Sequence, residues 1–203
     1  MKIFCIGRNY AEHIEELKNE KPDEPVIFLK PDTAMLRRNR PFYIPPFSNN
    51  LHHEVELVLK IEKVGKNISP KFASRYYCSV GIGIDFTARD LQDKLKAKGL
   101  PWEKAKAFDY SAAFSDTFLP LSDFNKEDIS FRLDINGETR QIGNSGQMIF
   151  PFDELIVHIS KYFSLKTNDL IYTGTPSGVG PVKIGDRLQA FIGDQKLMDF
   201  MIK

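Results

Sequence analysis

Two apolar segments that carry carboxylates constrain this chain more than any other feature. Apolar residues occupy every second position of residues 54–61, which predicts a β-strand with one buried face and sets Glu54 and Glu56 together on the other face. The apolar run 80–84 predicts a second strand that ends at Asp85. Carboxylates about 7 Å apart along one strand face repel each other in a low-dielectric cleft unless a cation or protons neutralise them.

These three carboxylates therefore predict a metal site. An all-oxygen set of ligands suits Mg²⁺, Mn²⁺ or Ca²⁺ better than Zn²⁺. The alternative is a polar strand face in contact with solvent, which an isolated Glu-x-Glu pattern would favour. Asp85, placed at the end of a second apolar strand, shifts the balance toward the metal.

The rest of the sequence predicts many short strands and few helices. The predicted strands cover residues 2–6, 26–29, 77–84, 131–135, 138–142, 170–172, 187–192 and 196–202. The predicted helices cover residues 11–19, 88–97 and 152–163, with a brief helix after Ser69-Pro70, and Thr87 with Asp90 resembles a capping box for the helix at 88–97. Asn136-Gly137 is typical of a hairpin turn. Because strands and helices do not alternate, we expect an α+β fold, a β-rich mixed roll rather than a doubly wound sheet.

Length and charge limit the function classes. The chain has 203 residues, of which 42% are hydrophobic, so we expect a single domain over residues 1–203. Its 28 basic and 27 acidic residues give a net charge of +1, which provides no field to recruit nucleic acid or an anionic membrane. A small molecule or another protein is the expected partner.

Cysteines and apolar runs bear on the compartment. Cys5 and Cys78 are the only cysteines, and each lies in an apolar stretch, which predicts reduced thiols in the core rather than a disulfide framework or a zinc site. The N-terminal apolar run is too short for a signal peptide, and no segment approaches the roughly 18 apolar residues of a membrane span. We therefore expect a cytoplasmic protein.

Two polar pairs on predicted helices could contribute chemistry. Arg89 and Gln92 share one helix face and could bind an anionic ligand, but an Arg89–Asp93 surface pair is an equal alternative. His13 and Glu16 are also three apart, and a histidine oriented by a carboxylate is a competent general base. On residues alone, a charged surface helix is the simpler interpretation of that pair.

Other polar residues are more ambiguous. The loop at residues 173–180 could bind an anion through backbone N–H groups, but it lacks the ending of a phosphate-binding loop, and a tight structural turn is the simpler interpretation. His52, His53 and His158 are expected to pack or to form hydrogen bonds, because the carboxylates already supply an oxygen site. Lys106, taken alone, would be a solvated lysine.

Six segments in register resemble the fumarylacetoacetate hydrolase family along nearly the whole chain. They are Gly7-Arg8-Asn9-Tyr10, Phe28-Leu29-Lys30-Pro31, residues 52–57, residues 85–93, Gly99-Leu100-Pro101-Trp102 and Thr173-Gly174-Thr175-Pro176. The short length and the Lys-Gly-Leu-Pro-Trp segment are most similar to the branch of acylpyruvate hydrolases and oxaloacetate decarboxylases.

This resemblance implies a β-rich mixed roll, a homodimer, and a Mg²⁺ or Mn²⁺ ion held by Glu54, Glu56 and Asp85. It also implies that residues 10–22 form a mobile lid, whose His13 and Glu16 activate water. The residues that match the family's substrate pocket are Arg89, Gln92, Lys106, Thr175, Lys30 and Tyr10, with Lys106 among the catalytic residues. Lys96 departs from the founding hydrolase, which has an aromatic substrate contact there, so that enzyme's substrate is not transferred.

The expected activity is metal-dependent cleavage of a carbon–carbon bond in 3-acylpyruvates, decarboxylation of oxaloacetate, or both, through one pyruvate enolate on the metal. A 2-oxo acid hydratase, isomerase or decarboxylase of aromatic catabolism would share the metal site and remains an alternative. A non-catalytic, metal-stabilised binding protein is the alternative from another class. A nuclease is disfavoured by the nearly neutral charge.

Overall fold

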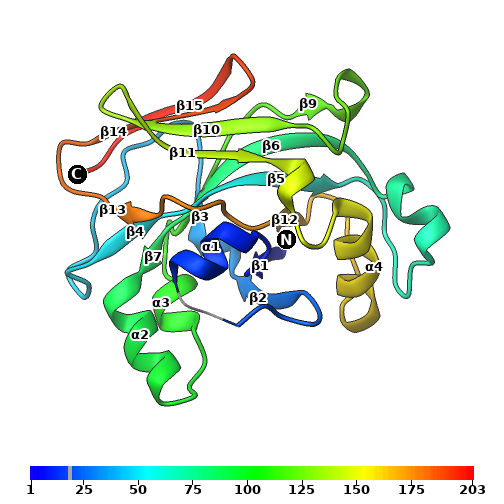
Figure 1. Cartoon of the computed structure of the whole chain (residues 1–203), viewed down its shortest axis with the longest axis horizontal. Coiled ribbons are helices and arrows are strands. Elements are labelled where there is room, and N and C mark those ends of the chain that lie inside the picture. The colour runs from blue at the N-terminus through cyan, green and yellow to red at the C-terminus, as the bar shows by residue number, and fades with distance from the viewer. Residues whose placement is uncertain (18–19) are drawn as a thin grey trace.

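The computed structural model describes residues 1–17 and 20–203, in which three β-sheets pack together and the α-helices lie below and beside them (Figure 1). The largest sheet has eight strands and mixes parallel with antiparallel pairs. In spatial order they are β2 (Val26–Lys30), β1 (Ile3–Gly7), β12 (Leu170–Tyr172), β5 (Val55–Ile61), β6 (Tyr77–Asp85), β8 (Ala112–Phe114) and β3 (Met35–Leu36), with β9 (Leu119–Pro120) also paired to β6. This arrangement confirms the predicted β-rich mixed α+β fold.

A second, antiparallel sheet lies over β5 and β6 (Figure 1). Its strands are β11 (Glu138–Asn144), β10 (Ser130–Ile135), β14 (Arg187–Ile192) and β15 (Gln195–Met201). Phe131, Leu188 and Phe200 from this sheet share one hydrophobic cluster with Leu57 and Ile82 of the large sheet. Each such side chain contributes roughly 1.5–3 kcal/mol when fully buried. The cluster therefore holds in place the two strands from which the carboxylates project.

The third sheet and the helices surround this core. The small sheet consists of β13 (Gly180–Pro181), β4 (Leu51–His53) and β7 (Thr87–Ala88). The helices are α1 (Ala11–Glu16), α2 (Arg89–Ala97), α3 (Glu103–Lys106) and α4 (Phe152–Tyr162), with 3₁₀ turns at η1 (Asp32–Ala34), η2 (Pro70–Arg75), η3 (Leu121–Asp123) and η4 (Ser145–Gln147). Helices α2 and α3 pack against each other and against β7. Within the described residues, no helix is long and apolar enough to cross a membrane.

The hairpin predicted at Asn136-Gly137 is present, and a second one closes the chain. β10 turns into β11 through Asn136 (φ 55°) and Gly137 (φ 83°), left-handed conformations that these two residue types adopt at low cost. β14 and β15 form the closing hairpin, with the turn at Gly193-Asp194.

Two predictions about the strands are wrong. β5 is buried on both faces rather than one, because the second sheet covers Leu57 while Val58 packs in a smaller cluster with Tyr172. Cys5 is buried as predicted, but Cys78 is exposed. Since neighbouring side chains of a strand point to opposite faces, the burial of Tyr77 turns Cys78 toward solvent.

The starts and ends of two helices also differ from the prediction. α2 begins at Arg89 without a side-chain cap, because Thr87 lies in β7 and the Asp90 carboxylate accepts hydrogen bonds from the Ser48 hydroxyl and the Asn49 backbone. α1 ends at Glu16, short of the predicted limit at residue 19. Residues 18 and 19, the end of that predicted helix, lie outside the described residues.

Candidate active site

The three predicted metal ligands meet in the interior. One oxygen from each of Glu54, Glu56 and Asp85 lies within 4.8 Å of the others, and none of the three residues is more than 5% exposed. Antiparallel pairing of β5 with β6 places Val55 opposite Ile84. This register brings Glu54, just before β5, beside Asp85 at the end of β6, and the Asp85 N–H donates to the Glu54 carbonyl at 2.8 Å.

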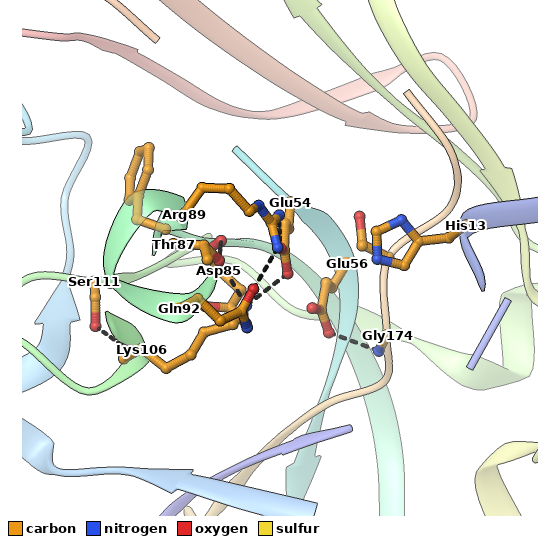
Figure 2. A network of polar contacts seen from close by, with 12 residues as sticks. His13, Glu54, Glu56, Asp85, Thr87, Arg89, Gln92, Lys106, Ser111 and Gly174 are labelled. Carbon is orange, nitrogen blue, oxygen red and sulfur yellow. Dashed lines mark hydrogen bonds and ion pairs between the residues drawn. The ribbon is translucent and has the colours of Figure 1, made fainter. Parts of the chain in front are cut away.

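Three buried cations lie against this carboxylate cluster, and two of them, Lys106 and Arg89, are labelled in Figure 2. Lys106, at the end of α3, places its Nζ 2.7 Å from Glu54 Oε2 and 2.8 Å from Asp85 Oδ2. Arg89 donates to Glu54 Oε1 at 2.5 Å. Lys30 pairs with Asp85 Oδ1 at 2.6 Å, although not in hydrogen-bond geometry. With all six side chains ionised, the cluster is formally neutral.

The carboxylates differ in their electrostatic environment. Burial would raise the pKa of Glu54, but the Lys106 ammonium and the Arg89 guanidinium lower it well below its usual range. Burial and the negative charges of Asp85 and Glu54 instead raise the pKa of Glu56 well above its usual range. Among the described residues, no cationic side chain forms an ion pair with Glu56, and its Oε2 accepts one hydrogen bond, from the Gly174 N–H at 2.6 Å.

The missing counter-charge at Glu56 fits a hard divalent cation. A buried carboxylate without a counter-charge is costly, and an oxygen-liganded Mg²⁺ or Mn²⁺ ion supplies that charge. Glu54, Glu56 and Asp85 would hold the ion. His52 and His53 are engaged elsewhere, as expected, with Asn50 and Gln141 respectively.

Arg89 and Gln92 face the cluster from the first turns of α2. Arg89 Nη1 donates to Gln92 Oε1 at 2.5 Å, and the Arg89 side chain does not pair with Asp93, so the surface-pair alternative is wrong. Arg89 Nε is buried and has no hydrogen-bond partner among the residues that the structure describes. It is therefore a donor available to an anionic ligand.

Helix α1 closes the site from the opposite side. His13 is 7% exposed, and Figure 2 shows its ring directed toward the carboxylates. His13 Nδ1 lies 3.2 Å from Glu16 Oε2, and the other oxygen of Glu16 accepts from the Gly178 N–H at 3.1 Å. A second contact joins the Ser177 hydroxyl to Glu12. The loop at residues 173–180 thus holds α1 over the cluster, and the interpretation of α1 as a plain surface helix is wrong.

The cavity between α1, α2 and the carboxylates is small. Its free volume is about 40 Å³, and it is partly open to the outside. Thr175, Gln92 and Lys106 line it together with His13 and Arg89. The described conformation therefore leaves little room, and a bound substrate would require movement of α1 or of side chains.

Two of the predicted pocket residues lie behind this wall. Lys30 reaches the site only through Asp85, and it also donates to the Ser111 carbonyl at 2.9 Å. Tyr10 packs its ring edge-on against Phe131, and its buried hydroxyl has no partner among the described residues. Neither lines the cavity, so contact with substrate stays a prediction for both.

Gln141 is a site residue that the sequence did not indicate. Its amide donates to Thr175 Oγ1 at 2.9 Å and to the Pro176 carbonyl, while its Oε1 accepts from the Val55 N–H at 3.0 Å. One side chain thus ties the loop that carries Thr175 to the strand that follows Glu54. Asn9 has a similar role: its side chain donates to the Thr173 carbonyl at 2.7 Å and accepts from the Phe150 N–H.

Comparison with known proteins identifies the family of this chain. The chain matches the family described as fumarylacetoacetate (FAA) hydrolase C-terminal over residues 2–202. It is 42% identical over 189 residues to the oxaloacetate tautomerase YcgM of Escherichia coli (strain K12), which covers 92% of this chain and 86% of that protein. It is also 42% identical over 202 residues to the mitochondrial oxaloacetate tautomerase FAHD1 of Bos taurus, and this match covers 99% of this chain and 91% of that protein.

Solved structures extend the agreement to the fold. Fumarylpyruvate hydrolase from Pseudomonas aeruginosa, determined in complex with Mn²⁺ and pyruvate, has a TM-score of 0.93 to this structure at 33% sequence identity, covering 100% of this chain and 89% of that one. The match over nearly all residues, the relatives at 42% identity and the shared fold lead to one conclusion. The chain belongs to the fumarylacetoacetate hydrolase family.

Proposed function

We propose that this chain is an enzyme of small 2-oxo acids that requires Mg²⁺ or Mn²⁺ and interconverts the keto and enol forms of oxaloacetate. The observation that carries the proposal is the meeting, in one narrow cavity, of the buried carboxylate cluster with the His13–Glu16 pair. Similarity to two oxaloacetate tautomerases supports the substrate, and the Mn²⁺ complex of the Pseudomonas hydrolase supports the metal. Tautomerisation of oxaloacetate was not among the activities expected from the sequence.

Cationic side chains bind the anionic substrate. Held by Glu54, Glu56 and Asp85, a divalent ion would supply positive charge that lowers the energy of negative charge on the substrate. Arg89 Nε offers an unused donor to the substrate carboxylate. Burial would lower the pKa of Lys106, but Asp85 and Glu54 raise it above its usual value. Lys106 therefore stays an ammonium, which binds negatively charged oxygen and does not accept a proton.

His13 moves the proton. In the neutral imidazole, Nδ1–H donates to Glu16, which leaves the Nε2 lone pair free. Burial lowers the pKa of His13, so the ring is unprotonated at neutral pH. His13 Nε2 takes a proton from carbon 3 of keto oxaloacetate, the released electron pair forms the C2–C3 double bond, and the carbonyl π pair moves onto the C2 oxygen. The His13 imidazolium then returns the proton, directly or through a water molecule, to the C2 oxygen, which gives the enol and restores the neutral ring. The reverse transfer returns the proton to carbon 3.

Cleavage of a carbon–carbon bond is the second candidate, supported by the likeness to fumarylpyruvate hydrolase. With a 3-acylpyruvate, His13 deprotonates water, the hydroxide adds to the acyl carbonyl, and the bond to carbon 3 breaks. The products are a carboxylic acid and pyruvate in its enolate form. Decarboxylation of oxaloacetate breaks the bond to the distal carboxylate instead and needs no activated water.

Three parallel assays test these proposals. Enol oxaloacetate is followed by its ultraviolet absorbance, pyruvate release by coupling to lactate dehydrogenase, and acetylpyruvate cleavage by loss of its absorbance. We expect the wild-type protein with Mg²⁺ to accelerate tautomerisation, EDTA to abolish the acceleration, and His13→Ala to reduce it by roughly 10²-fold or more. Glu15→Gln, in the same helix but exposed, is the matched control and should be unaffected. If none of the three reactions is accelerated, the enzymatic proposals are refuted and a binding protein is the remaining interpretation. If only pyruvate release is accelerated, decarboxylation is favoured over tautomerisation.

A further inference from the structure

The outer part of the cavity carries more positive charge than the chain itself neutralises. Arg8 and Lys96 line it together with Arg89. Arg89 is committed to Glu54 and Gln92. Arg8 and Lys96 have no ion-pair partner among residues 1–17 and 20–203, and both are only partly exposed. Within the described part of the chain, Arg8 Nε is buried without a hydrogen-bond partner, and the guanidinium makes one long bond, 3.4 Å, to the Glu20 carbonyl.

These cations lie close enough to repel one another. Burial lowers the pKa of Lys96, and the positive charges of Arg89 and Arg8 lower it further. The Lys96 ammonium lies 5.5 Å from the centre of the Trp102 ring, so the indole holds the side chain against the cavity wall. Partly buried like charges without a counter-ion cost free energy, which an anionic ligand between them would recover.

The backbone at Arg8 is strained. Arg8 has φ 59°, the left-handed region that non-glycine residues seldom adopt. The next residue, Asn9, is fully buried and bonded to the Thr173 and Phe150 backbones, so the turn after β1 is fixed from both ends. Such strain persists only where surrounding contacts overdetermine it, and it is concentrated at functional sites. Here it accompanies a cation on the wall of the cavity.

We propose that Lys96 and Arg8 form a second carboxylate subsite, so that the enzyme selects 2-oxo dicarboxylic acids over monocarboxylic ones. The inference rests on the proposed function, in which the carboxylate and keto group at the reacting end of the substrate bind beside the carboxylate cluster. The distal carboxylate then meets Lys96 and Arg8. An apolar tail of the same length would desolvate these two cations without pairing them, which disfavours monocarboxylic acids.

Binding of unreactive probes tests the subsite without relying on turnover. Malate and 2-hydroxybutanoate have the same reacting end and four carbons, but malate has a carboxylate where 2-hydroxybutanoate has a methyl group. In calorimetry with saturating Mg²⁺, we expect the wild-type protein to bind malate on the order of 10- to 100-fold more tightly, the usual gain from a hydrogen bond to a charged group. Equal affinity for the two probes would overturn the subsite.

Variants of Lys96 test whether this residue produces the preference for malate. Lys96→Met keeps a side chain of similar length without the ammonium and should lose most of the preference for malate, whereas Lys96→Arg should retain it. Lys98→Met, on the exposed end of the same helix, is the matched control. A preference that survives in a folded Lys96→Met protein would refute the role of Lys96. If that variant does not fold, a Lys96→Arg protein with no preference for malate would do so.

Oxalate separates this inference from the proposed function. Both of its carboxylates belong at the reacting end, so its affinity should be the same in wild type and Lys96→Met. If the protein binds oxalate but does not prefer malate over 2-hydroxybutanoate, the subsite is refuted and the proposed function is not. Preference for malate with no tautomerase, decarboxylase or hydrolase activity would support the subsite and refute the proposed reaction.

Discussion

Replacing Glu56 by Gln should uncouple the protein from its metal without disturbing the fold. Glu56 is 2% exposed, has no cationic partner among the described residues, and accepts one bond from the Gly174 N–H. The amide oxygen introduced by Glu56→Gln can still accept that bond, so the substitution removes the charge and little else. It should therefore abolish stabilisation by Mg²⁺ while sparing, or raising, the stability of the metal-free protein.

The size of the effect follows from mass action. A ligand at 100 times its dissociation constant stabilises the native state by about 2.7 kcal/mol. For a domain of this size, 1 kcal/mol moves the melting temperature by roughly 2–4 °C, so saturating Mg²⁺ should raise the wild-type value by roughly 5–10 °C. The Glu56→Gln protein should move by less than about 2 °C on the same scale.

The pH dependence of the metal-free protein gives an independent test. The raised pKa of Glu56 means that the folded state binds more protons than the unfolded state above the unfolded pKa of 4.5. Stability then falls as pH rises through this window. Glu56→Gln should remove that loss, so its advantage over wild type in EDTA should grow from pH 5 to pH 8.

Melting curves with EDTA and with increasing Mg²⁺, at several pH values, measure both effects. Glu62→Gln is the matched control, because Glu62 follows the same strand but is exposed. It should keep the full Mg²⁺ shift. An unchanged Mg²⁺ shift in Glu56→Gln would place the metal outside the carboxylate cluster and refute the reasoning.

Three further predictions follow from individual contacts. His13→Ala should slow hydrolysis of a 3-acylpyruvate by roughly 10²-fold or more and decarboxylation of oxaloacetate less, because only hydrolysis needs an activated water; equal losses in steady-state rates would contradict this. Gln141→Leu should lower the free energy of unfolding in urea by about 1–3 kcal/mol, because the Val55 N–H loses its acceptor. It should also raise KM for the 2-oxo acid substrate, because Thr175 loses the hydrogen bond from Gln141 that positions it. Burial lowers the pKa of His52 to about 4. As the pH falls from 6.5 toward 4, His52 therefore gains a proton in the unfolded state before it does so in the folded state, and the free energy of unfolding decreases. His52→Gln should reduce this decrease, measured by urea titrations at pH 7 and pH 4.5.

The carboxylate cluster could be predicted because local rules determine it. Alternation along a strand puts Glu54 and Glu56 on one side, and an apolar run that ends at Asp85 supplies the third oxygen ligand. The identities of Arg89, Gln92 and Thr175 as pocket residues came from family resemblance, and the structure brings all three to the cavity wall. Periodicity alone left each of them with an equal or simpler structural explanation.

Gln141 escaped prediction because its orientation depends on an irregularity. A regular hairpin around Asn136-Gly137 would pair Gln141 with Arg132 on the outer face. Instead the register shifts after Leu133, Arg140 becomes the extra residue, and Gln141 pairs with Leu133. The shift turns Gln141 into the core and leaves Ile142 68% exposed. Hydrophobic patterning predicts the opposite orientation for both, since a slip of one residue exchanges the two faces of a strand.

The charges around the cluster also follow from long-range packing, and they bear on the order of binding. Lys30, Arg89 and Lys106 come from three separate elements and balance the three carboxylates. A divalent ion therefore adds two positive charges to a formally neutral site. A dianion such as oxaloacetate offsets both of these added charges, whereas a monoanion offsets only one of them. The metal should accordingly bind before the substrate, and it should strengthen binding of dianions more than binding of monoanions.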